Sequence, residues 1–170
     1  KYQFSESNLM KAEELKEPET SLQTLRITRI CHINKDIVFN AWTDPNMLEK
    51  WWGSFMFKDS DSEFDLRVGG KIRIDVKGFD DAIYPVVGAL RQIVPREKLV
   101  FDISPLDRNG NEIFRFLVTV TFASVIGETE LKVTVRDESG GPEGERYLKN
   151  MEEWWIESLG RLRNVFDNMM

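Results

Sequence analysis

The sequence is poor in the residues that build metal centres and disulfide frameworks. Its 170 residues include one cysteine, Cys31, and one histidine, His32. A single cysteine excludes an internal disulfide, and a single histidine excludes a metal site built from several imidazoles. No apolar run approaches the roughly 18 residues that a membrane-spanning helix needs. We therefore expect no metal, no cofactor and no membrane span.

Basic residues are in the minority. The 23 lysines and arginines are outnumbered by 29 aspartates and glutamates, which gives a net charge of −6. Because such a chain repels phosphate backbones, nucleic acid is not an expected partner. Residues 1–20 lack the apolar core of a secretory signal, so the expected location is cytoplasmic. We predict a loosely ordered or weakly helical leader over residues 1–20 and a single domain over 21–170.

Local patterns predict a strand followed by a helix. Apolar and polar residues alternate from Leu22 to His32, which is typical of a strand with one buried face. Asn34 is a good N-cap, and a helix is predicted over Lys35–Thr43. Ile33 and Val38 have the spacing of a hydrophobic staple across the start of this helix.

A second, very short helix carries a pair of tryptophans. Asp44 is its predicted cap, Pro45 its first residue, and Gly53 is placed to end it. Trp51 and Trp52 therefore stand at its C-terminal end. We expect these two indoles to lie at the rim of an opening in the fold while contacting a later helix.

The middle of the chain reads as an antiparallel meander of about six strands. The Asn109-Gly110 dipeptide predicts a type I′ hairpin turn, because both residue types tolerate positive φ. The apolar and alternating segments cover residues 54–59, 71–78, 82–94, 98–106, 112–122 and 130–137.

A long amphipathic helix is predicted from Glu145 to Phe166. Its apolar stripe has helical spacing and consists of Tyr147, Met151, Trp154, Trp155, Ser158, Leu159, Leu162 and Phe166. The predicted fold class is α+β: a curved antiparallel sheet of six to seven strands wrapped around this C-terminal helix, with two short helices after the first strand.

A curved sheet that closes around a helix leaves room for a hydrophobic pocket between them. The expected ligand-binding residues are the large apolar side chains of this region together with one tyrosine hydroxyl. They are Trp51, Trp52, Phe55, Phe57, Tyr84, Phe101, Phe116, Trp154, Trp155 and Leu159. The alternative interpretation is that these side chains only fill the core.

No catalytic residue is predicted. His32 falls at a strand end on the outward parity, and Cys31 has inward parity but no adjacent base. Arg67 precedes a double glycine and is expected to tie down that loop. The sequence contains no phosphate-binding glycine loop and no metal-ligand spacing.

Several segments in order resemble a known superfamily. They are TRICHINKDIVFNAWTDPNMLEKWWG, DLRVGGKIRI, IVPREKLVF and WWIESLGRLRNVF. Together they resemble the SRPBCC, or START-like, helix-grip superfamily, and within it the branch named for the activator of the heat-shock-protein-90 ATPase. The resemblance covers about residues 24–168. It implies a hydrophobic cavity that in relatives holds lipids, sterols, polyketides or plant hormones, and in some of them carries out catalysis.

Three functions remain open from the sequence. The first is non-catalytic binding of a lipid or aromatic metabolite by a monomer or homodimer. The second is a cavity enzyme of the cyclase, dehydratase or hydrolase type that acts on an aromatic or polyketide-like compound. The third, suggested by the branch name, is a module that contacts a chaperone and modulates its ATPase, with a role in stress response.

Overall fold

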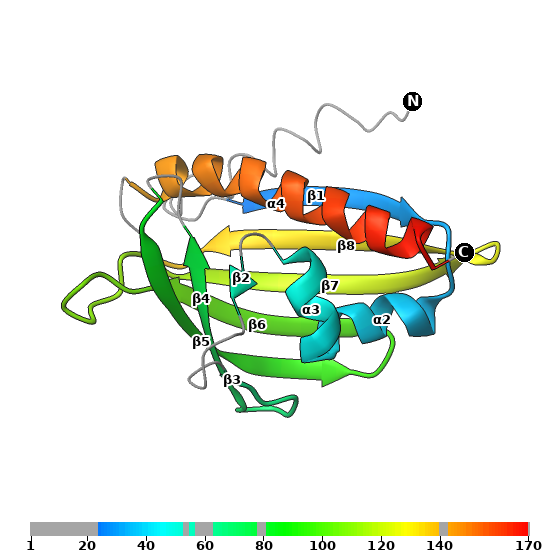
Figure 1. Cartoon of the computed structure of the whole chain (residues 1–170), viewed down its shortest axis with the longest axis horizontal. Helices are drawn as coiled ribbons and strands as arrows, with labels where there is room; N and C mark the ends of the chain where they lie inside the picture. The colour runs from blue at the N-terminus through cyan, green and yellow to red at the C-terminus, as the bar shows by residue number, and fades with distance from the viewer. Residues whose placement is uncertain (1–23, 53–54, 57–62, 78–80, 140–142, 170) are drawn as a thin grey trace, which may run out of the picture.

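The computed structural model describes residues 24–52, 55–56, 63–77, 81–139 and 143–169. An antiparallel sheet curves around three helices that lie on one of its faces (Figure 1). The strands are β1 Thr24–Cys31, β2 Phe55–Met56, β3 Glu63–Phe64, β4 Lys71–Lys77, β5 Ile83–Val94, β6 Lys98–Pro105, β7 Phe116–Val125 and β8 Glu128–Asp137. The helices are α2 Lys35–Thr43, α3 Pro45–Trp51 and α4 Gly144–Asp167.

Six of the strands are long, and two have only two residues each. The strand order is β1-β8-β7-β6-β5-β4-β2, with β3 also paired to β4. The predicted fold class is therefore confirmed: a six- to seven-stranded curved sheet around a long C-terminal helix, with two short helices after the first strand. The predicted leader, residues 1–20, lies outside the described residues.

Buried and more exposed side chains alternate along the strands, so the sheet has one buried face and one solvent-exposed face. In β7 the side chains of Val118, Val120 and Phe122 are buried, and in β8 those of Val133 and Val135 are buried. The residues between them are more exposed. The alternate, apolar side chains of both strands therefore face the helices and form the core.

Local capping residues set the two short helices where the sequence predicts them. The side chain of Asn34 accepts a hydrogen bond from the amide of Ile37 at 3.1 Å, and α2 covers the predicted Lys35–Thr43. Asp44 caps α3 by accepting from the amide of Asn46 at 3.0 Å. The predicted terminator of α3, Gly53, lies outside the described residues. The C-cap of α3 is Trp52, whose amide donates to the carbonyl of Leu48 at 3.0 Å.

The prediction of a type I′ turn at Asn109-Gly110 is wrong. Gly110 has a positive φ of 84°, but Asn109 does not belong to the positive-φ residues of the described chain. The Asp107 carboxylate instead accepts the amides of Asn109 and Asn111, at 2.8 and 2.9 Å. This side chain holds a longer loop in place of a two-residue turn.

Positive φ at two successive residues occurs in the next hairpin, between β7 and β8. Ile126 has φ 46° and Gly127 has φ 80°, and Val125 pairs with Glu128 on either side of them. A β-branched residue rarely adopts this conformation. The twist of the paired strands therefore determines the conformation of this turn, although isoleucine by itself disfavours a positive φ.

The long helix α4 packs against α3, β1 and β8, along one edge of the sheet (Figure 1). Its buried line includes Leu148, Trp155, Leu159, Leu162 and Phe166. The helix starts beside the end of β8. A Cβ atom on Gly144 would overlap the buried carboxylate of Asp137, so a side chain at the first helical position would require that carboxylate to move.

Close contact between strands makes a glycine necessary in β5. A Cβ atom on Gly88 would lie 1.9 Å from the backbone oxygen of Asp102 in β6. We expect Gly88→Ala to lower the free energy of unfolding by about 1–3 kcal/mol, because backbone atoms must move to relieve the overlap. Urea unfolding followed by tryptophan fluorescence measures the change.

The matched control is Gly160→Ala in α4. No atom lies within 4 Å of a Cβ built there, and alanine favours a helix over glycine. This variant should be more stable than the parent by about 0.5–1 kcal/mol. Equal effects of the two substitutions would contradict the close-packing account of the β5–β6 contact.

Candidate functional site

All five tryptophans of the sequence meet in one cluster between the helices and the sheet. Trp42 comes from α2, Trp51 from α3, Trp52 follows α3, and Trp154 and Trp155 are neighbours in α4. The Trp42 and Trp51 rings are 4.6 Å apart between centroids, and Trp42 stacks parallel to Trp155 at 6.1 Å. Trp154 and Trp155 are nearly perpendicular at 5.2 Å. The cluster therefore joins all three helices.

Trp51 has a structural role within this cluster. Its side chain is completely buried, and its indole N–H donates to the carbonyl of Ala41 in α2 at 2.9 Å. This bond fixes the angle between the two short helices. The expectation that Trp51 stands at the rim of an opening is not met, because the packing of α3 against α2 places the ring inside the core.

Trp52 connects α4 to the sheet. Only 4% of the residue is exposed, so it too lies inside and not at a solvent-facing rim. Its ring centroid is 5.8 Å from that of Phe101 in β6, 5.9 Å from Trp154 and 5.5 Å from Trp155. The expected contact of this tryptophan with the later helix is present.

The other residues named as ligand-binding fall into three groups. Phe101, Phe116, Trp155 and Leu159 are buried, and Trp154 is half-buried against the core. Tyr84 is half-buried in β5 on the same parity as the buried Val86 and Leu90, so it belongs to the helix-facing side of the sheet. The Phe55 side chain and Phe57 lie outside the described residues.

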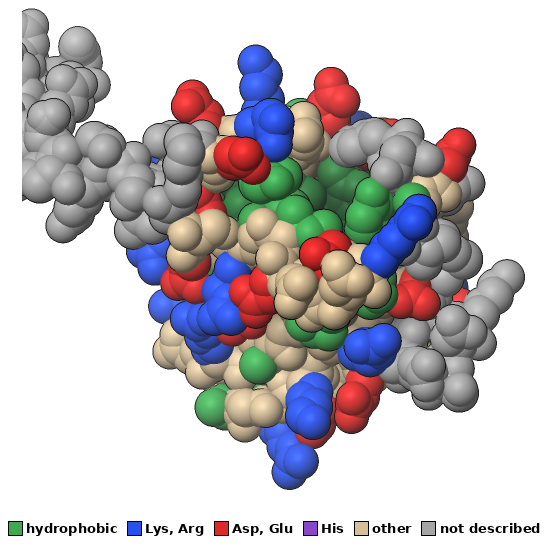
Figure 2. Space-filling view, turned by 90° about the vertical axis from the view of Figure 1, so that its left-hand side faces the viewer, with side chains coloured by type: hydrophobic (Ala, Val, Ile, Leu, Met, Phe, Trp, Pro, Cys, Tyr) green, Lys and Arg blue, Asp and Glu red, His purple; other side chains and the backbone are tan. Residues whose placement is uncertain are grey.

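A second aromatic group lies where α4 begins. Phe114 stacks on Tyr147 of α4 at 4.4 Å and contacts Phe116 at 4.6 Å. Figure 2 views this end of the molecule and shows apolar side chains gathered in a hollow, with acidic and basic side chains around it. Phe116 therefore belongs with this group as well as with the core.

Sequence reasoning missed Trp42 and Phe114 as members of the site. Trp42 follows Val38 by four residues, which places both on the buried face of α2 and was a usable signal. Phe114 lies outside any strand, just before β7, and its partner Tyr147 is 33 positions away in the printed sequence. No local pattern identifies such a pair.

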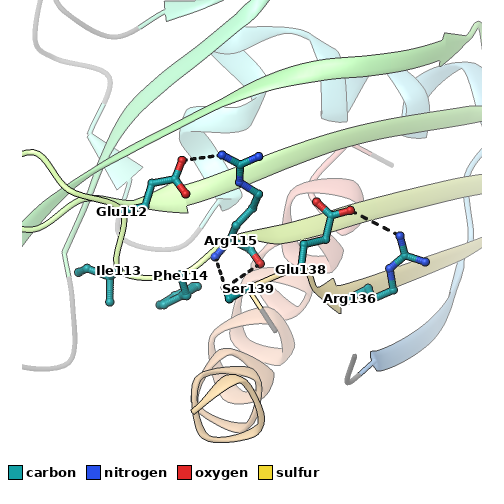
Figure 3. Close-up of a pocket in the computed structure, with 7 residues that line it drawn as sticks. All are labelled: Glu112, Ile113, Phe114, Arg115, Arg136, Glu138 and Ser139. Carbon is teal, nitrogen blue, oxygen red and sulfur yellow. Dashed lines mark hydrogen bonds and ion pairs between the residues drawn. The ribbon is translucent and has the colours of Figure 1, made fainter. Parts of the chain in front are cut away.

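An open pocket of about 590 Å³ lies at the same end of the sheet (Figure 3). It is lined by Glu112, Ile113, Phe114, Arg115, Arg136, Glu138 and Ser139. Ser139 is held by the backbone of Arg115, whose amide donates to its hydroxyl at 2.7 Å. This pocket is more polar than the tryptophan cluster, since charged side chains make up most of its lining.

The charges around this pocket are already paired. Arg115 contacts Glu112 at 2.7 Å, and the hydrogen bond and charge of that carboxylate raise the pKa of the guanidinium. Arg91 contacts Asp102 at 2.7 Å and Glu138 at 3.2 Å, and the hydrogen bond to Asp102 is the main cause of its raised pKa. These pairs leave no excess charge that would favour an ionic ligand.

The residues weighed for catalysis do not assemble a reactive site. His32 is exposed and pairs with Glu128 across the β1–β8 edge. Cys31 is buried, and loss of solvation raises the pKa of its thiol from 9.0 to about 11. Arg67 binds Asp65 at 2.7 Å within its own loop, as expected from its place before the double glycine.

The described residues provide neither a metal-binding group nor a membrane-spanning helix. Within the described ranges, no three His, Cys, Asp or Glu side chains form a group that could hold a metal ion. No helix of the described chain is both long enough and apolar enough to cross a membrane.

Solved structures with the same fold come from several bacteria. The AHSA1 protein of Silicibacter pomeroyi matches with a TM-score of 0.73 at 20% identity, over 87% of this chain and 100% of that one. A protein from Arthrobacter aurescens matches with a TM-score of 0.72 at 22% identity, over 85% and 86% of the two chains. A protein from Chromobacterium violaceum gives 0.68 at 24% identity, over 84% and 96%.

These likenesses establish the fold, and the sequence itself establishes the family. None of the curated proteins compared with the sequence matches it. The family described as "Activator of Hsp90 ATPase homolog 1-like protein" matches residues 33–167, which run from the residue before the α2 cap to the end of α4. The chain therefore belongs to the Activator of Hsp90 ATPase homolog 1-like family.

Proposed function

We propose that this protein binds a small hydrophobic molecule, a lipid or an aromatic metabolite, between its sheet and α4, without chemical conversion. The observation that carries the proposal is the width of the apolar face of α4. Beside the buried line of this helix runs a second line of half-buried apolar side chains, Tyr147, Met151 and Trp154. It extends from Tyr147, which stacks on Phe114, to the tryptophan cluster, which Trp154 joins.

The energetics of such binding follow from the apolar area that a ligand covers. Burial contributes about 25 cal/mol per Å², so a ligand that covers part of this apolar line on α4 gains several kcal/mol of binding free energy. The entropy lost when the ligand is immobilised opposes this gain. The half-buried Tyr84 is a suitable polar group to orient the ligand. The helix-grip resemblance, with its hydrophobic cavity, agrees with this proposal.

The state of Cys31 and His32 supports binding over catalysis. A nucleophilic cysteine needs a lowered pKa, and the thiol of Cys31 has a raised one. The imidazole of His32 is exposed and held by Glu128, away from the apolar interior. We therefore rank a cavity enzyme below a binding protein.

A second candidate function is modulation of a chaperone ATPase. It is supported by the description of the family to which residues 33–167 belong. Copurification with a heat-shock protein 90 and a change in its ATP hydrolysis would favour this function over ligand storage or transport.

Binding is tested with the neutral fluorescent probe N-phenyl-1-naphthylamine. We expect the probe to gain fluorescence on saturable binding, and Met151→Lys to weaken its Kd at least about tenfold because an ammonium group would be desolvated beside the ligand. Ile156→Lys is the matched control: it makes the same change on α4 at a residue that is 44% exposed, and should alter Kd less than about twofold. Absence of saturable binding, or equal effects of the two variants, would contradict the proposal.

The thiol of Cys31 gives a pH-dependent prediction. Between pH 9 and 11 the unfolded chain releases this proton while the folded chain keeps it, so the free energy of unfolding falls as pH rises. We expect the fall to be steeper in the parent protein than in Cys31→Val, which lacks the titrating group. Urea titrations at several pH values measure both slopes. Parallel slopes, or rapid labelling of the native thiol at pH 8, would show that burial does not protect it.

A further inference from the structure

Buried polar atoms without partners are concentrated at one place in the described chain. Among the described residues, five buried side-chain nitrogen or oxygen atoms have no hydrogen-bond partner. Four of them belong to the tryptophan cluster and the adjoining turn of α4: Nε1 of Trp42, Trp154 and Trp155, and Oγ of Ser158. The fifth, Oδ2 of Asp137, lies against Gly144 at the start of α4.

Helical spacing places three of these groups on one side of α4. Ser158 follows Trp154 by four residues and Trp155 by three, so all three share the face that meets the core. Trp42 approaches from α2 and stacks on Trp155. The residues Trp42, Trp154, Trp155 and Ser158, here called the donor cluster, therefore converge from two helices.

Such a concentration is unusual for packing alone. Buried indole and hydroxyl groups nearly always have partners, and each unpaired group lowers stability. In the same cluster Trp51 has its N–H bonded to a backbone carbonyl at 2.9 Å, so the fold can satisfy an indole where that ring serves structure only. Phenylalanine in place of tryptophan, and alanine in place of serine, would fill most of the same volume with no unpaired donor.

The chemistry of the donor cluster specifies the complementary group. An indole N–H can only donate, and the serine hydroxyl can also donate, so the partner must accept hydrogen bonds. No Lys or Arg side chain belongs to the buried residues of the described chain, so nothing there offsets a buried negative charge. An uncharged oxygen such as that of a ketone, ester or amide fits, and a carboxylate does not.

We infer that the ligand of this protein carries an uncharged carbonyl-type oxygen that accepts hydrogen bonds from the donor cluster. This inference rests on the hydrophobic-ligand site proposed above and specifies the chemical class of its ligand. Trp154 connects the two features. Its side chain is half-buried in the apolar line of α4, while its Nε1 atom is fully buried and unpartnered.

The test compares two probes that share the naphthalene ring and differ in the carbonyl oxygen, 1-acetylnaphthalene and 1-ethylnaphthalene, by equilibrium dialysis. We expect the ketone to bind at least about tenfold more tightly, because its oxygen satisfies donors that the ethyl group leaves unpaired. The double variant Trp154→Phe/Ser158→Ala should bring the two affinities within about twofold of each other. Ile156→Ala, on the exposed side of the same helix, should leave the tenfold preference unchanged.

Stability of the ligand-free protein gives a second readout. Removal of an unpartnered hydroxyl should raise the Tm of Ser158→Ala above that of the parent, whereas loss of a satisfied hydroxyl would lower it. A lowered Tm would overturn the inference, since it would show that the ligand-free protein already satisfies this group.

The binding outcomes separate the inference from the proposal beneath it. Equal affinity for the two probes would overturn the carbonyl inference and leave hydrophobic binding intact. A ketone preference that survives in the double variant would also overturn it, because another part of the protein would then be the donor. If neither probe binds, the proposed function fails and the inference fails with it.

Discussion

The contact of α4 with the short helices through five tryptophans is the constraint on which the arrangement of the helices depends. A seven-residue helix such as α3 is too short to be stable in isolation, so its existence depends on burial of its apolar side chains. A large aromatic ring buries 150–250 Å², which corresponds to about 4–6 kcal/mol at the usual coefficient. With Trp51 fully buried and Trp52 nearly so, these two rings contribute a large share of the burial that holds the end of α3 in place.

The same cluster explains why the sheet and the helices form one unit. Trp52 contacts Phe101 of β6 as well as both tryptophans of α4, while α4 itself packs mainly over β1 and β8 at the sheet edge. Trp52 therefore connects the centre of the sheet to a helix that lies along its edge. A smaller side chain at this position would leave a cavity between them, because the backbones are fixed elsewhere by strand pairing and by close approaches such as that at Gly88.

The parts of the structure that the sequence predicts well are those that local chemistry decides. Asn34 and Asp44 cap helices with their own side chains, and α2 begins and ends at the predicted residues. Alternation in the strands identifies the buried face because side-chain direction has a period of two. The loop at Asp107 was mispredicted for a related reason: one carboxylate accepting two amides outweighs the preference of Asn-Gly for a two-residue turn.

The site was less predictable because it depends on contacts between distant segments. The sequence identifies Trp52, Trp154 and Trp155 as candidates, but not the depth of Trp51, which is set by its bond to Ala41. The stack of Phe114 on Tyr147 joins a segment before β7 to the first turn of α4, and no periodicity links them. Whether a buried indole N–H has a hydrogen-bond partner is even harder to predict from the sequence. Nothing in the sequence distinguishes Trp51, whose N–H is bonded, from Trp155, whose N–H is not.

These differences bear on how function is assigned in this family. Caps, glycines and alternating strands specify the scaffold, and none of them constrains which molecule is bound. Packing in the core requires only large apolar side chains, and phenylalanine would fill most of the volume of Trp42 or Trp155 and leave a small cavity. What phenylalanine cannot supply is the indole N–H, whose burial without a partner opposes folding. Under the proposed function, the polar atoms left unpaired inside the apolar interior are therefore a better guide to the chemistry of the ligand than the apolar surface around them.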